Sequence, residues 1–104
     1  MFSSISIIIG SERMTFEWDD NKEQINIKKH GIDFETASHV FDGYYVDIYD
    51  EKHSDFEDRY IAIGIINQIT CIVTVVYTER VNKIRIISAR KATKEERKMY
   101  YDYS

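Results

Sequence analysis

The sequence predicts an α+β protein in which two N-terminal helices, a mostly antiparallel sheet and a C-terminal helix follow one another. Three observations support this fold class. The 104 residues suffice for one modest core, and 43% hydrophobic with 31% charged residues is typical of a globular protein. Capping residues mark the helix ends. Short polar connections separate the apolar strands, which favours hairpins over helical crossovers.

The start of the chain is predicted to be an accessory segment. We expect residues 1–14 to form an N-terminal extension that is poorly ordered or pairs weakly at a sheet edge, and residues 15–104 to form a single domain. Residues 2–10 lack a basic flank and are too short to cross a bilayer, so neither export nor membrane contact is predicted. With a lone cysteine, Cys71, this favours the cytoplasm.

Two helices are predicted after a short strand at residues 16–18. Asp19 and Asp20 are capping carboxylates for the first helix, with Glu23 in capping-box position, and this helix ends near His30 before Gly31. The second helix begins after Asp33 and ends at residues 42–43. Its apolar residues recur at helical spacing and predict a buried stripe of Phe34, Ala37, Val40 and Phe41.

Four strands are predicted next, at residues 45–49, 59–66, 70–77 and 83–88. Residues 70–77 are almost continuously apolar, which is typical of a central strand covered on both faces. Thr93, with Glu96 in capping-box position, predicts a final helix that runs towards Tyr103.

The charge is unevenly distributed. The net charge is −4, which argues against nucleic-acid binding because that affinity comes largely from Lys and Arg contacts to phosphates. Residues 80–98, however, hold eight Lys/Arg against two Asp/Glu. The last strand and helix therefore form a basic zone, and the arginines around the strand can grip a phosphate with two parallel hydrogen bonds.

Several motifs together resemble the BrnT toxins. They are FEWD at residues 16–19, KHGI at 29–32, HS at 53–54 followed by Glu57, Arg59 and Tyr60, IAIG at 61–64, VYTER at 76–80 and IRIISARKAT at 84–93. The similarity covers nearly all of residues 15–103. The departures are the N-terminal extension and the overall acidity.

The resemblance implies a RelE-like fold and a ribonuclease that arrests translation. It also implies neutralisation by a BrnA-type ribbon-helix-helix antitoxin, with operator DNA bound only through the toxin–antitoxin complex. A different class of function remains open, a non-enzymatic binding partner of a DNA-binding antitoxin. The acid-rich first half of the chain suits either function, because it could dock a basic antitoxin helix.

Metal-independent RNA cleavage needs a base, an acid and cationic groups around the phosphorane. The predicted catalytic residues are His53, Glu57, Arg59, Arg80 and Arg85. Which residue is base and which is acid stays open, and Glu57 could instead pair with Arg59. The residues predicted to contact substrate are Lys29, Arg90, Lys91 and Arg97. No metal site or cofactor is predicted, because one cysteine and three widely spaced histidines form no zinc pattern.

Overall fold

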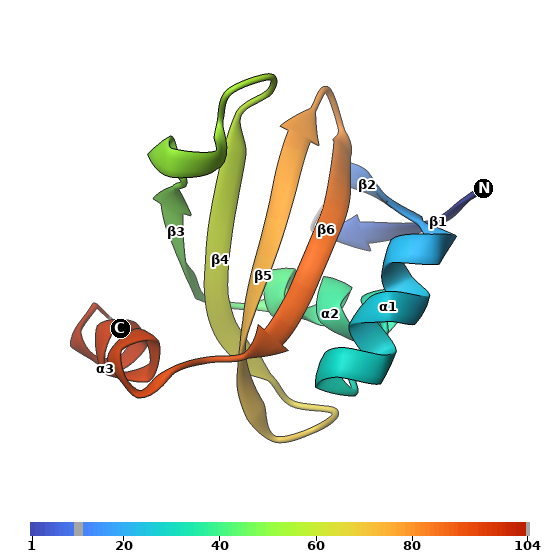
Figure 1. Ribbon diagram of the computed structural model, residues 1–104. Helices are drawn as coiled ribbons and strands as arrows, with labels where there is room; N and C mark the ends of the chain where they lie inside the picture. Colours follow the sequence, from blue (N-terminus) through green and yellow to red (C-terminus); the bar gives the residue numbers. More distant parts are fainter. Residues whose placement is uncertain (10–11, 104) are drawn as a thin grey trace.

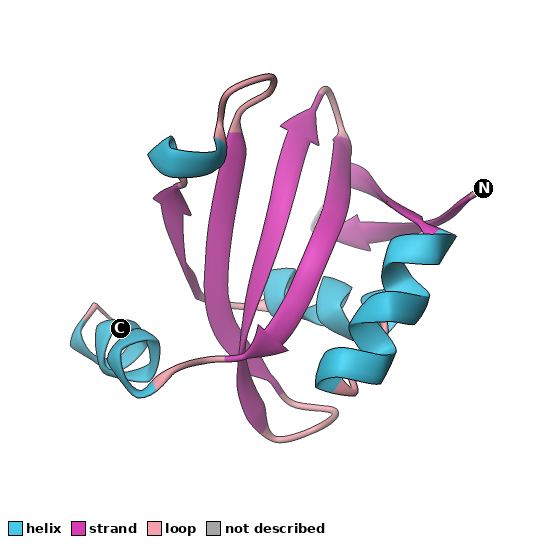
Figure 2. Ribbon diagram, in the orientation of Figure 1, coloured by secondary structure: helices cyan, strands magenta, loops and turns pink. Residues whose placement is uncertain are grey.

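The computed structural model describes residues 1–9 and 12–103 and is an α+β structure with one six-stranded sheet (Figure 1). Its strands are β1 (Phe2–Ile9), β2 (Glu12–Asp19), β3 (Tyr45–Tyr49), β4 (Arg59–Ile66), β5 (Cys71–Arg80) and β6 (Lys83–Lys91). The α-helices are α1 (Asp20–His30), α2 (Phe34–Ser38) and α3 (Lys94–Asp102), and the short 3-10 helices are η1 (His39–Asp42) and η2 (Glu51–His53). Figure 2 distinguishes the helices from the sheet.

The strand order is β1-β2-β6-β5-β4-β3, and the sheet is mixed. The pairs from β3 to β6 are antiparallel, as predicted for this part of the chain. The pair of β2 with β6 is parallel, with Phe16 opposite Ile84, and was not predicted. These strands are distant in the sequence, and their pairing leaves no turn signal between them.

The first residues lie at the sheet edge, where β1 pairs antiparallel along the length of β2. Of the two alternatives considered for this extension, the structure has edge pairing. The strand that was predicted at residues 16–18 is correspondingly longer, because β2 begins at Glu12. Ile5 and Ile7 pack partly buried against the main core.

The helix ends are largely those predicted. Asp19 is the N-cap of α1, accepting from the backbone N–H groups of Asn21 and Lys22, and Gly31 is its left-handed C-cap. The capping-box role of Glu23 was wrong, because its carboxylate instead accepts from the backbone N–H of Phe34 and ties α1 to α2. The complete capping box of Thr93 and Glu96 at α3 is confirmed.

The second helix is shorter than predicted. Regular α-helix stops at Ser38, and η1 completes the segment to Asp42. The predicted apolar stripe is nevertheless buried. Within the described residues, no helix is long and apolar enough to cross a membrane.

The sheet has a core on each face. α2 and η1 cover one face, where their apolar side chains join Phe16, Trp18 and Val75 in the main core. α3 covers part of the opposite face, where Met99 and Tyr100 pack with Ile63 and its neighbours. We call this second face the α3 face. Figure 1 shows α1 beside β6 and α3 beyond β4, with the strands between them.

Asn26 fixes α1 against the sheet. Its side chain is buried, accepts from the backbone N–H of Ala89 at 3.1 Å, and donates to the carbonyls of Ala89 at 2.8 Å and Ile32 at 2.9 Å. β2 pairs with β6 only as far as Ile86. The amide of Asn26 therefore takes the place of a neighbouring strand at Ala89.

We predict that Asn26→Ala destabilises the fold by about 2–4 kcal/mol, because it leaves buried backbone groups at Ala89 without partners. Urea denaturation measures the change. Lys28→Ala, an exposed position on the same helix, is the matched control and should change stability by less than about 0.5 kcal/mol. Equal stability of the two variants would contradict this role for Asn26.

Candidate functional site

The strand register aligns four polar residues across the α3 face. Arg59 on β4 lies opposite Thr78 on β5, and Thr78 lies opposite Arg85 on β6. Arg85 in turn lies opposite Glu17 on β2. Directly opposed residues project from the same face of a sheet. Two arginines that were predicted from the sequence therefore flank Thr78, with backbones about 10 Å apart across two strand spacings.

Arg85 is held by two groups from the N-terminal strands. Its Nε and Nη2 atoms donate to one carboxylate oxygen of Glu17, at 2.9 and 2.6 Å. Its guanidinium carbon lies 4.9 Å from the centre of the Phe2 ring, in cation–π contact. Arg85 is thus oriented before any ligand binds, and its side chain keeps 30% of its surface exposed.

Thr78 is unusual among these residues. It is 2% exposed. Its hydroxyl is the one buried side-chain N or O atom, within residues 1–9 and 12–103, that has no hydrogen-bond partner. A buried hydroxyl without a partner carries a free-energy cost. This buried hydroxyl lies in the row between Arg59 and Arg85.

The loop between β3 and β4 places the remaining predicted catalytic residues. Nδ1 of His53 lies 3.0 Å from a carboxylate oxygen of Asp50. The Ser54 hydroxyl donates to the carbonyl of Asp50 at 2.6 Å and accepts from the backbone N–H of Arg59 at 3.0 Å. These bonds fix the loop against the start of β4. They leave the second ring nitrogen of His53 free of Asp50.

The five predicted catalytic residues gather at one end of the sheet. His53, Glu57 and Arg59 line a hollow of about 250 Å³ together with Asp55 and Phe56. Arg80 at the end of β5 lies 3.4 Å from Glu57 and lines, with Arg85, a neighbouring hollow. Figure 1 shows the β3–β4 loop and the β5–β6 turn at this same end.

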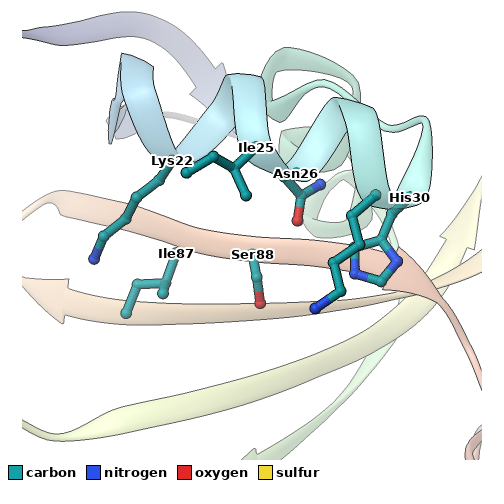
Figure 3. Close-up of a pocket in the computed structure, with 7 residues that line it drawn as sticks. Lys22, Ile25, Asn26, His30, Ile87 and Ser88 are labelled. Carbon is teal, nitrogen blue, oxygen red and sulfur yellow. The ribbon is translucent and has the colours of Figure 1, made fainter.

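The predicted substrate-binding residues are not gathered there. Arg90 donates to both carboxylate oxygens of Glu96, at 2.7 and 3.0 Å, and Arg97 donates to the carbonyl of Ala92 at 2.9 Å. Lys91 is exposed at the end of β6. Lys29 lines a groove between α1 and β6. Figure 3 shows this groove with other residues of its lining.

Glu17 and Thr78 were not among the site residues predicted from the sequence. Alternation along β2 places Glu17 on the face opposite Phe16 and Trp18, which is a visible signal. The partner of Glu17 could not be predicted without the parallel register. Within the described ranges, no group of three His, Cys, Asp or Glu side chains could hold a metal ion.

Residues 18–96 match the sequence profile of a family described as "Ribonuclease toxin, BrnT, of type II toxin-antitoxin system". The chain belongs to this family. No curated protein matches the chain.

The BrnT match includes all five predicted catalytic residues and Asn26, and it excludes β1. Glu17 lies immediately before it. The contact of Phe2 and Glu17 with Arg85 therefore joins residues outside the matched range to one inside it.

Glu96 anchors α3 on the α3 face of the sheet, where it contacts Thr74 and Arg90. Burial raises the pKa of its carboxyl group, but hydrogen bonds from Arg90, the Thr93 backbone and Thr74 outweigh this, so the pKa falls from 4.5 to about 2. A pKa that is lower in the folded state stabilises the fold above the unfolded pKa. This stabilisation is lost as the pH falls from 4.5 towards 2.

We predict that Glu96→Gln lowers the melting temperature near neutral pH and that its deficit against the parent shrinks as pH falls from about 4.5 to 2. Thermal unfolding across this range measures both effects. Glu95→Gln, an exposed change in the same helical turn, is the control and should follow the parent. A deficit that stays constant down to pH 2 would contradict the assignment.

Proposed function

We propose that the protein is a metal-independent endoribonuclease toxin that cleaves RNA and thereby arrests translation in the cytoplasm. A BrnA-type ribbon-helix-helix antitoxin would neutralise it, with operator DNA bound only by the complex. The observation that carries the proposal is the convergence of His53, Glu57, Arg59, Arg80 and Arg85 at one end of the α3 face. Family membership and the α+β architecture also support a RelE-like ribonuclease domain at residues 15–104, with residues 1–14 as an accessory extension.

The proposed reaction is attack of the RNA 2′-oxygen on the adjacent phosphorus. A base removes the 2′-hydroxyl proton, a cyclic phosphate forms, and an acid protonates the departing 5′-oxygen. His53 can fill either role, because Asp50 holds its Nδ1 atom and leaves the other ring nitrogen for a proton transfer. Glu57 is the second group placed to exchange a proton in the same hollow.

Arg59, Arg80 and Arg85 would stabilise the charge on the phosphorane. Arg59 has no ion pair within the described part of the chain, so a phosphate need not displace a carboxylate from it. Arg80 and Glu57 are 58% and 39% exposed in their side chains. A salt bridge this exposed adds little stability, and phosphate can replace its carboxylate at low cost.

Expression without antitoxin tests the function. Induction should arrest growth with cleavage of cellular RNA, and co-expression of the cognate antitoxin should abolish both effects. Harmless expression of folded toxin, with no cleavage of RNA in vitro, would refute the proposal. That outcome would favour the non-enzymatic binding partner.

Arginine variants test the site. Arg85→Ala and Arg80→Ala should each reduce cleavage of a model RNA by about a hundredfold or more, because they remove charge stabilisation of the transition state. Lysine should rescue poorly, because it lacks the planar fork of donors. Lys94→Ala, on an exposed part of α3, is the charge-matched control and should cleave at the parental rate.

Arg85→Ala also leaves Glu17 without its main partner, so a structural effect needs its own control. Arg85→Ala/Glu17→Ala removes both members of the pair. The double variant should recover thermal stability and remain inactive. Recovery of cleavage would show that Arg85 acts only by neutralising Glu17, and parental cleavage by the folded single variants would refute this placement of the site.

A further inference from the structure

Some cationic side chains lie outside the proposed active site and form no ion pair in the described part of the chain. Arg80, Lys83, Arg85 and Arg90 all have carboxylate partners in Glu57, Glu17 and Glu96. Lys22 and Lys29 on α1 have no ion pair within the described residues. The carboxylates of α1 are engaged elsewhere, since Asp20 accepts from Ser3 and Glu23 accepts from the Phe34 backbone.

These lysines share a groove of about 210 Å³ between α1 and β6, lined by Lys22, Ile25, Asn26, Lys29, His30, Ile87 and Ser88. Figure 3 shows the Lys22 and His30 side chains extending from α1 towards β6, where Ile87 and Ser88 lie. The groove exists because β2 stops pairing with β6 at Ile86 and a helix, held by Asn26, takes its place.

The groove and the proposed active site both contain a β6 residue that projects from the α3 face. Val76 and Thr78 alternate on β5 and share the α3 face, and they lie opposite Ser88 and Arg85 respectively. A register shift between Val76 and Tyr77 accommodates one extra residue on β6 and so puts Ser88 on the same face as Arg85. The two β6 positions are about 10 Å apart along the strand.

We infer that this groove binds a phosphate of the RNA substrate outside the scissile bond, with Lys22 and Lys29 as its cations and the Ser88 hydroxyl as a further donor. The inference rests on the proposed ribonuclease function. Ile25, which is 58% exposed, and Ile87 form apolar walls. Low-dielectric walls beside charges of one sign focus the electrostatic field and strengthen attraction of an anion. An acidic protein can in this way retain local affinity for RNA.

Lys22→Glu/Lys29→Glu tests the inference on two substrates. For a ten-nucleotide RNA, KM should rise about tenfold or more with kcat within twofold of the parent, because binding is lost away from the reacting atoms. The slope of log KM against log salt should fall by about 1. For a dinucleoside monophosphate, whose single phosphate is the scissile one, kcat/KM should stay unchanged.

Lys28→Glu/Lys94→Glu is the matched control, because it changes the net charge equally at exposed positions outside the groove. It should retain the parental KM for the long RNA. An unchanged KM in the groove variant, or equal effects of the two double variants, would overturn the inference while the parent still cleaves RNA. Weakened antitoxin binding with parental KM would also overturn it and make the groove an antitoxin contact. Absence of cleavage by the parent would instead refute the ribonuclease function itself.

Discussion

The side-chain amide of Asn26 is the contact on which the rest of this structure depends. It forms three hydrogen bonds, two of them to the N–H and carbonyl of Ala89, in a buried position where β6 has no strand beside it. Because the amide substitutes for a strand, the chain can leave the sheet after β2 and continue as α1. This exchange opens the lysine-lined groove next to β6. In Figure 1 the strands of the α3 face lie between α1 and α3.

Ion pairs within this acidic chain hold two arginines of the α3 face in place. Glu17 orients Arg85, and Glu96 holds Arg90 at the base of α3. Buried or half-buried carboxylates of this kind fix the position of an arginine at the expense of its net field. Among the described cations without an ion pair, Arg59 lies in the row across the sheet, and Lys22 and Lys29 line the groove beside β6. In the proposed mechanism, the arginines therefore bind the scissile phosphate. The lysines bind a phosphate elsewhere in the RNA.

Sequence patterns predicted the strands and helix ends that depend on interactions between residues close in the sequence. Alternation and apolar runs located β3 and β4 at their observed bounds, and Thr93 with Glu96 identified the start of α3. His53, Glu57 and Arg59 gather because one loop and the strand after it hold them. The parallel pair of β2 with β6 and the contact of Glu23 with Phe34 depend on tertiary packing, which no spacing encodes. For that reason the partner of Arg85 and the groove at Lys22 emerged only from the structure.

We propose that RNA lies on the α3 face between α1 and the β3–β4 loop. Titration of ¹⁵N-labelled toxin with a 2′-O-methyl RNA, which cannot be cleaved through its 2′-oxygen, tests this most directly by backbone amide shifts. The largest changes should fall on Lys22, Arg59, Arg85 and Ser88, and on the amide of Thr78, which lies between Arg59 and Arg85. Changes confined to the face covered by α2, or the absence of saturable changes anywhere, would contradict it.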